Sequence, residues 1–287
     1  MSEHPLIGFI GQGFIGKNYA DDFENRGFKV IRYSQELEYV ANREAIATCD
    51  FVFIAVPTPT TPQGFDDSIL ASVLSLVGIG KAAIIKSTIV PGTCESLQAQ
   101  YPDRFIFHSP EFLTEKTAAF DAAHPTRNII GYPIDSDEYR AKAEEILDLL
   151  PAAPLRLACQ AKEAELVKYA ANCFLFLKVI YANILYDLAV KEGSDWEHIK
   201  AGMASDPRIG ASHLDPVHAS GTAIESGRGA GGHCFVKDFA AFLNYARGCE
   251  LDLASIDFLA AAEAKNLSLL NTSGKDADII ASVYGQS

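Results

Sequence analysis

Several patterns that would assign this sequence to a common class of protein are missing from it. Acidic residues outnumber basic ones, 37 against 24, which gives a formal net charge of −13 at pH 7. Broad nucleic-acid binding needs a basic surface to neutralise phosphates, so that function is disfavoured. The six cysteines form no CxxC pair and have no histidine at metal-ligand spacing, which argues against a metal site and a disulfide framework.

Membrane and export signals are also missing. No uninterrupted apolar run approaches the roughly 18 residues that a membrane helix needs, and residues 1–5 do not begin a secretory leader. We therefore expect a cytoplasmic protein with reduced thiols, a small-molecule substrate, and neither a membrane nor a nucleic-acid partner.

The chain has enough apolar material for two cores, with 287 residues of which 48% are hydrophobic. Up to about residue 160, short apolar runs alternate with helix-compatible segments, and helical patterns follow. This order predicts an α/β fold, with a doubly wound parallel sheet in residues 1–160 and an all-helical second domain in residues 161–287. Strands are expected at 6–10, 28–33, 51–56, 82–86, 104–108, 128–131 and 154–158, and helices at 17–25, 68–77, 137–150, 161–191 and 255–270.

A glycine-rich turn follows the first expected strand. It reads Gly11-Gln-Gly13-Phe-Ile-Gly16 and leads into a helix and a second strand within about 30 residues. The first glycine permits the tight turn, the second lets a pyrophosphate approach the backbone, and the third lets helix and strand pack, with the phosphates over the helix N-terminus. We expect a Rossmann-like domain that binds a nicotinamide dinucleotide.

The acid that normally follows the second strand of such a domain and holds the adenosine ribose is absent. The strand ends Ile31-Arg32-Tyr33-Ser34, and Glu36 comes two residues too late. Ser34 with the nearby Arg32 could instead accept a 2′-phosphate, or Arg32 could simply face solvent. We expect NAD as cofactor, with NADP left open.

Polar clusters follow three successive expected strands, at 57–59, 86–88 and 109–111. Ligands of such sheets bind beyond the carboxyl ends of the strands, so these loops should line the cofactor and substrate cleft. Ordinary turn chemistry would use the same residue types.

The long helix expected at 161–191 carries apolar residues three and four apart, which predicts one buried stripe. The stripe consists of Leu166, Tyr169, Ala170, Cys173, Leu177, Ile180, Ile184 and Leu188. On another face, Glu165, Lys168 and Asn172 project together. Lys168 could be a surface charge paired with Glu165, or it could be functional. The polar region 205–232 is expected to be a long loop, which is uncommon inside a compact domain unless it is functional.

A second glycine-rich stretch, Gly227-Arg-Gly-Ala-Gly-Gly-His-Cys-Phe-Val-Lys-Asp238, combines a thiol, an ammonium and a carboxylate. Glycines allow a close approach of substrate, and a nearby Lys237 would favour the thiolate of Cys234. Cys234 is thus either a nucleophile behind a turn or a structural cysteine.

Together these motifs resemble the nucleotide-sugar 6-dehydrogenase family, that of UDP-glucose and GDP-mannose dehydrogenases, along nearly the whole sequence. The resemblance rests on the first glycine turn, 56–59, 86–88 with 91–93, 109–115, Glu165 to Lys168 with Asn172, 206–210 and 231–238. It implies oxidation of a primary alcohol to a carboxylate in two hydride transfers to NAD, through a cysteine thiohemiacetal and thioester.

The resemblance also implies roles for individual residues. Cys234 would be the nucleophile, and Lys168 and Asn172 would hold the developing oxyanion. Asp238 would act with water as acid or base, and Thr88 with Glu111 would position the hydrolytic water. Arg208 would reach substrate across a homodimer interface formed by the helical domain. Cofactor contacts would come from Gly11, Gly13, Phe14, Ile15, Gly16, Ser34, Pro57, Thr58, Thr88 and Glu115, and substrate contacts from Glu111, Phe112, Leu113, Lys168, Arg208, Gly231 and Lys237.

This chain departs from the family pattern at Ser34, Lys116, Ile184 and Val236, and it stops before the third domain that normally covers the nucleotide half of the substrate. The substrate is then smaller or differently held, another chain completes the site, or activity is reduced. Two other functions stay open: a two-domain β-hydroxyacid dehydrogenase with one hydride transfer, and a non-catalytic protein that only binds the cofactor.

Overall fold

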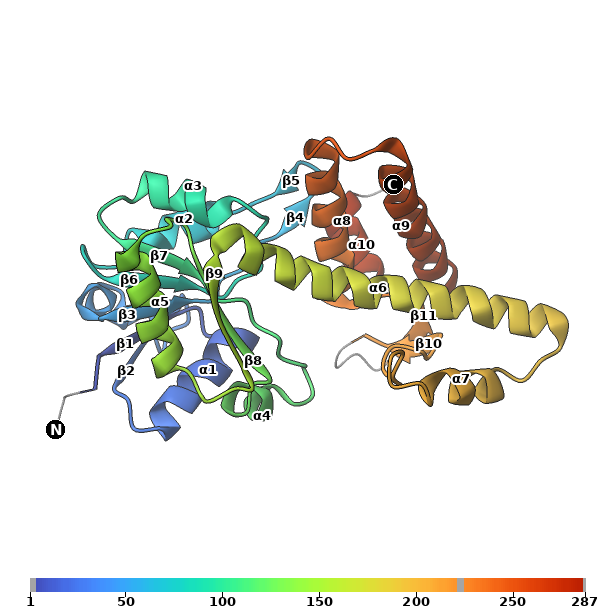
Figure 1. Cartoon of the computed structure of the whole chain (residues 1–287), viewed down its shortest axis with the longest axis horizontal. Helices are drawn as coiled ribbons and strands as arrows, with labels where there is room; N and C mark the ends of the chain where they lie inside the picture. The colour runs from blue at the N-terminus through green and yellow to red at the C-terminus, as the bar shows by residue number, and fades with distance from the viewer. Residues whose placement is uncertain (1–3, 221–224, 286–287) are drawn as a thin grey trace. The chain divides into compact units, whose positions relative to one another are not determined.

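The computed structural model describes residues 4–220 and 225–285, and the chain divides into two compact units (Figure 1). The N-terminal unit comprises residues 1–59 and 66–168, and the C-terminal unit comprises residues 60–65 and 169–287. The short segment 60–65 therefore belongs to the second unit, although the first unit flanks it in sequence.

The N-terminal unit is built on a seven-stranded sheet with the order β2-β1-β3-β6-β7-β8-β9. All neighbouring strands are parallel except β7 and β8, which are antiparallel where His108 lies opposite Gly131. The predicted doubly wound α/β fold is confirmed, with this one reversal. The strands are β1 (Ile7–Ile10), β2 (Val30–Tyr33), β3 (Phe51–Ile54), β6 (Ala82–Ile85), β7 (Phe105–His108), β8 (Arg127–Tyr132) and β9 (Leu155–Gln160).

Strands β1, β3 and β6 are buried along their whole length, as expected for parallel strands covered on both faces. Phe9 on β1 stacks on Phe53 of β3 at 5.2 Å between ring centres, and Phe23 of helix α1 meets both rings. Burying a phenyl side chain stabilises a fold by about 1.5–3 kcal/mol, so this cluster holds the glycine turn between β1 and α1 firmly in place.

Five α-helices accompany this sheet in the described part of the N-terminal unit, where α1 packs beside α4 and α5 packs along β8. Helix α5 begins where the sequence provides a cap, because the Ser136 hydroxyl accepts the Tyr139 N–H and two acids occupy its first turn. The helices are α1 (Phe14–Asn25), α2 (Ser68–Leu74), α3 (Thr93–Gln100), α4 (Ala118–Ala123) and α5 (Asp137–Leu149), with short 3₁₀ helices at Val40–Asn42 and Glu44–Thr48.

Helix α6 (Ala161–Glu192) begins in the N-terminal unit and continues through the C-terminal one. Its predicted extent is confirmed, and the predicted buried stripe is confirmed only in part, at Tyr169, Cys173 and Ile180. Leu166, Ala170, Ile184 and Leu188 are exposed, whereas Glu165, Lys168 and Asn183 are buried. Of the helices in the described part of the chain, it alone is long and apolar enough to cross a membrane by length and composition, a test that core helices also pass.

The C-terminal unit is mainly helical. Helix α9 (Leu253–Ser273) covers the predicted segment and is capped by Asp252, whose carboxylate accepts the Ser255 N–H. The expected loop 205–232 is partly structured, because β10 (Val217–Ala219) pairs antiparallel with β11 (Ser226–Arg228); residues 221–224 of that loop lie outside the described residues. The other elements are β4 (Thr60–Thr61), β5 (Gly64–Phe65), α7 (Trp196–Ala204), α8 (Gly232–Gly248) and α10 (Ala277–Tyr284).

Candidate active site

The first glycine turn has the geometry that a dinucleotide pyrophosphate requires. Gly11 has a φ of +90°, and a Cβ there would lie 2.1 Å from the Ala55 carbonyl oxygen. A Cβ on Gly16 would lie 1.9 Å from the Gly11 carbonyl oxygen. Gly13 differs, because an added Cβ would meet no atom within 4 Å, and no side chain caps the α1 N-terminus at this residue. Open space before an uncapped helix N-terminus, with Phe14 and Ile15 beginning the helix, fits a bound phosphate.

The three loops expected to line the cleft are hydrogen-bonded to one another. Ser87 accepts the Val56 N–H at 3.0 Å and donates to the Val56 carbonyl at 2.7 Å, and the Thr58 hydroxyl donates to the Thr88 carbonyl at 2.7 Å. Lys86 donates to the carbonyl and hydroxyl of Ser109. The loops after β3, β6 and β7 therefore form one layer, as their register predicted.

Lys168 and Glu111 form a buried ion pair. The Lys168 ammonium lies 2.9 Å from Glu111 Oε1, and the two side chains are 7% and 6% exposed. The other Glu111 oxygen accepts the Leu113 N–H at 2.8 Å. Removing one partner of such a pair would leave the other buried without its ion-pair partner, so each side chain orients the other.

Lys168 is therefore not a surface charge paired with Glu165, and that alternative is wrong. Glu165 is fully buried and accepts the backbone N–H groups of Gly92 at 2.6 Å and Cys94 at 2.8 Å. Burial raises the pKa of Glu165 to about 7, against the opposing effect of these two donors. The carboxyl group holds the start of α3 and the turn that follows Thr88.

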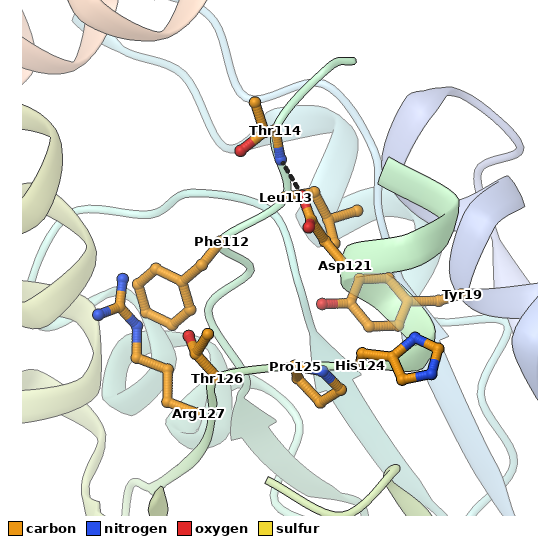
Figure 2. A pocket seen from close by; sticks show the side chains of 9 residues that line it. All are labelled: Tyr19, Phe112, Leu113, Thr114, Asp121, His124, Pro125, Thr126 and Arg127. Carbon is orange, nitrogen blue, oxygen red and sulfur yellow. Dashed lines mark hydrogen bonds between the residues drawn. The ribbon is translucent and has the colours of Figure 1, made fainter. Parts of the chain in front are cut away.

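A pocket of about 190 Å³ opens behind the loop that follows Glu111 (Figure 2). Phe112 and Leu113, both expected to contact substrate, line it together with residues of α1, α4 and the start of β8. The Arg127 guanidinium stacks on the Phe112 ring at 3.7 Å, and the Lys168 ammonium lies 5.6 Å from the same ring. Arg127 thus orients the loop residue next to Glu111. Glu115 is exposed.

Beneath these loops lie two buried bases. Lys86 lies 4.1 Å from the centre of the Tyr19 ring, and burial lowers its pKa to about 7. Burial, together with the positive charge of Lys86, lowers the pKa of His108 to about 3. His108 is therefore neutral at pH 7.

In the C-terminal unit, two of the predicted residues bond to Asp238, which is 1% exposed. Its Oδ2 accepts the Asn172 amide at 2.6 Å, and its Oδ1 lies 2.5 Å from the Lys237 ammonium. Cys234 is exposed, and it lies in the first turn of α8 rather than on a loop, because the helix begins at Gly232. The predicted loop 205–232 thus ends where this helix begins.

Residues that the sequence did not single out hold the backbone before Cys234. Asp276 accepts the Gly232 N–H at 2.8 Å, Lys275 donates to the Gly229 carbonyl at 3.1 Å, and Asn266 bonds both backbone groups of Ala230. A Cβ on Gly231 would lie 1.9 Å from the Asp276 carboxylate. No local motif marks these residues, since their partners are about 36 to 46 positions away.

The predicted residues thus fall into two sets. Thr88, Glu111 and Lys168 lie in the N-terminal unit, and Asn172, Cys234, Lys237 and Asp238 in the C-terminal one. Arg208 joins neither set, because its side chain is 88% exposed and pairs only locally with Asp206 at 2.6 Å.

The sheet and its glycine turn define a dinucleotide-binding protein of the Rossmann type. Comparison of sequences makes this more specific. Residues 32–148 match the NAD binding domain of the UDP-glucose/GDP-mannose dehydrogenase family, and residues 162–267 match its central domain. The two matches together cover more than half of the sequence, and the chain belongs to this family.

Individual relatives agree with this assignment. The UDP-glucose 6-dehydrogenase of Pseudomonas aeruginosa is 35% identical over 243 residues, which are 78% of this chain and 49% of that protein. A UDP-glucose dehydrogenase structure from Pyrobaculum islandicum is 26% identical with a TM-score of 0.76, covering 92% of this chain and 69% of that one. A 3-hydroxyisobutyrate dehydrogenase from Mycobacterium tuberculosis shares the fold, at 17% identity with a TM-score of 0.72, and covers 98% of both chains. This chain spans about half the length of the curated relatives that it matches.

Proposed function

We propose that the protein is a cytoplasmic NAD-dependent oxidoreductase that oxidises the primary alcohol of a nucleotide sugar to a carboxylate, with Cys234 as covalent nucleophile. The observation that carries this proposal is the exposure of the Cys234 thiol in the first turn of α8. The charged and amide side chains assigned to the chemistry are oriented by partners within their own units. Side chains held in this way can stabilise the oxyanion that develops on a substrate carbonyl without first having to reorient.

The first half of the reaction converts the alcohol to an aldehyde. Bound NAD⁺ would accept the hydride from the alcohol carbon, which is the chemistry that the cofactor supplies. The hydroxyl proton passes to a base, and we assign this task to Asp238 acting with water. The Asn172 amide and the Lys237 ammonium, both bonded to Asp238, set its orientation.

The second half begins at Cys234. The thiolate attacks the aldehyde carbon, a C–S bond forms, and the carbonyl π electrons move to the oxygen, where Lys168 and Asn172 donate hydrogen bonds. A second NAD⁺, held at the turn of Gly11, Gly13 and Gly16, would accept a second hydride from the same carbon and so leave a thioester on Cys234. Water positioned by Thr88 and Glu111 attacks the thioester, the C–S bond breaks and the thiolate returns. Per substrate, one water and two NAD⁺ are consumed, and one carboxylate, two NADH and three protons are formed.

A homodimer through the helical unit belongs to the same proposal. Phe174, Tyr181 and Leu188 follow one another at intervals of seven on α6 and are 69%, 58% and 52% exposed. Such a stripe of large apolar side chains is typical of a helix packed against a partner. Arg208, exposed on the same unit, would reach the substrate bound by the other protomer. Light scattering tests this directly, since Tyr181→Glu should yield a monomer.

The competing function is a single hydride transfer of the β-hydroxyacid dehydrogenase type, which shares a lysine and an asparagine four residues apart on the long helix. It has no use for a nucleophilic cysteine, so the two functions differ in what Cys234 does.

The test compares Cys234→Ala with Cys249→Ala, because Cys249 is also exposed but lies at the opposite end of α8. Candidate substrates and cofactors are first screened by thermal shift. We expect Cys234→Ala to bind NAD⁺ normally and to form no carboxylate, while Cys249→Ala matches wild type. Carboxylate formation by Cys234→Ala at the wild-type rate would reject the covalent mechanism.

A further inference from the structure

A shallow hollow of about 470 Å³ is lined by residues of α1, by Val30 and Arg32 of β2, and by the segment 38–42 that follows the strand. In this fold the adenosine ribose of a dinucleotide binds at the carboxyl end of β2, one residue beyond Arg32. The charged side chains of the hollow are two bases, Lys17 and Arg32, and three acids, Asp21, Glu24 and Glu38. The acids come from α1 and from the segment after β2, and none occupies the position at the strand end where the ribose-binding acid is usual.

Arg32, the residue that could have bound a 2′-phosphate, is engaged by acids of the protein. Its Nη2 lies 2.7 Å from Asp21 and 2.7 Å from Glu24, and its Nε donates to the second Glu24 oxygen at 3.0 Å. Its Nη1 faces the Gln12 side-chain oxygen at 3.4 Å. The Arg32 side chain is only 11% exposed, so the guanidinium is enclosed by these partners. It does not simply face solvent, which was the other possibility that the sequence left open.

The second base is also paired. The Lys17 ammonium lies 2.8 Å from Asp21, which therefore bridges Lys17 and Arg32. With three carboxylates against two cations, the hollow carries a net charge of −1. A ribose 2′-hydroxyl is neutral and can donate a hydrogen bond to a carboxylate, whereas a 2′-phosphate would meet excess negative charge and no unpaired cation.

We propose that Asp21 and Glu24 make this site selective for a dinucleotide with a free 2′-hydroxyl, because they engage Arg32 and so withhold it from a 2′-phosphate. The selectivity that other proteins of this fold obtain from an acid at the end of β2 is here supplied by α1, the helix that precedes β2. The inference rests on the proposed function only in that the site binds a nicotinamide dinucleotide.

The test measures dissociation constants by calorimetry for NAD⁺ and NADP⁺, and for the adenosine halves 5′-AMP and 2′,5′-ADP. Wild type should bind NAD⁺ and 5′-AMP at least about tenfold more tightly than their 2′-phosphorylated counterparts, as expected for repulsion between neighbouring unit charges. The double variant Asp21→Asn with Glu24→Gln should shift the NADP⁺ to NAD⁺ affinity ratio by about tenfold or more toward NADP⁺. Glu44→Gln is the matched control, because Glu44 is 89% exposed and does not line the hollow.

The double variant both frees the Arg32 guanidinium and removes two negative charges that would repel a 2′-phosphate. A triple variant that adds Arg32→Met distinguishes these two effects. It should lose most of the gain in NADP⁺ affinity, and a triple variant that keeps the gain would contradict the role of Arg32. An unchanged affinity ratio in the double variant, or equal binding of both dinucleotides by wild type, would overturn the inference while leaving dinucleotide binding intact. Failure of NAD⁺ and 5′-AMP to bind wild type would reject the proposed function itself, and the inference with it.

Discussion

Glu165 provides the clearest prediction about stability. Its carboxyl group is 0% exposed and accepts N–H groups from Gly92 and Cys94, yet burial raises its pKa from 4.5 to about 7. A carboxyl group with a raised folded-state pKa binds its proton more tightly in the folded protein than in the unfolded one. Its contribution to stability is therefore fully present below about pH 4.5 and is lost as the pH rises through about 7.

The expected size of this effect follows from the shift. A change of roughly two and a half pKa units corresponds to about 3 kcal/mol, and this is the loss in the free energy of unfolding that the group contributes between about pH 4.5 and 8. Glu165→Gln cannot ionise and lacks this loss. The stability of the variant relative to wild type should therefore rise with pH across this interval.

Urea unfolding at several pH values between 5 and 8 measures the difference in the free energy of unfolding between Glu165→Gln and wild type. The pH dependence that all other groups give to both proteins cancels in this difference. Glu192→Gln, at the exposed end of the same helix, is the control and should follow wild type at every pH. If the difference between Glu165→Gln and wild type is independent of pH, or if wild type gains relative stability as the pH rises, the carboxyl group is not desolvated as described.

Two further predictions concern the backbone at the site. Gly13→Val should keep the fold and abolish NAD⁺ binding, because its Cβ would meet no protein atom within 4 Å but the side chain would fill the space before α1. Gly11→Val should instead unfold the protein, because its Cβ would lie 2.1 Å from the Ala55 carbonyl oxygen. Thermal melting combined with NAD⁺ titration distinguishes the two results. Asp276→Ala removes the acceptor for the Gly232 N–H at the start of α8, so it should lower the free energy of unfolding in urea by about 1 kcal/mol. It should also lower kcat more than it raises KM. The control variant Asp278→Ala should match wild type in both assays.

The parts of the fold that follow from local patterns could be predicted from the sequence. The glycine turn, the buried strands and the extent of α6 depend on residues close together in the chain, and their predicted positions agree with the structure to within a few residues. The polar clusters at three strand ends also meet as expected, because parallel strands end at the same edge of a sheet.

Features decided by distant residues could not be predicted. The spacing of apolar residues on α6 indicated only part of the buried face, because Glu165 and Lys168 are buried against backbone donors and a carboxylate more than 50 residues away. No local motif marks the start of α8, because Asp276, which accepts the Gly232 N–H there, lies 44 residues further on. Arg32 looked available for a phosphate, but Asp21 and Glu24 on the preceding helix bind it.

The central claim is that Cys234 carries the substrate through a second oxidation, and the number of hydrides transferred per substrate tests it most directly. With a substrate identified by thermal shift, the NADH formed is measured by absorbance and the substrate consumed by chromatography. We expect two NADH per substrate and a carboxylate product in wild type and Cys249→Ala, and no carboxylate in Cys234→Ala. One NADH per substrate with an aldehyde or ketone as the final wild-type product would contradict the account and favour a single-step dehydrogenase.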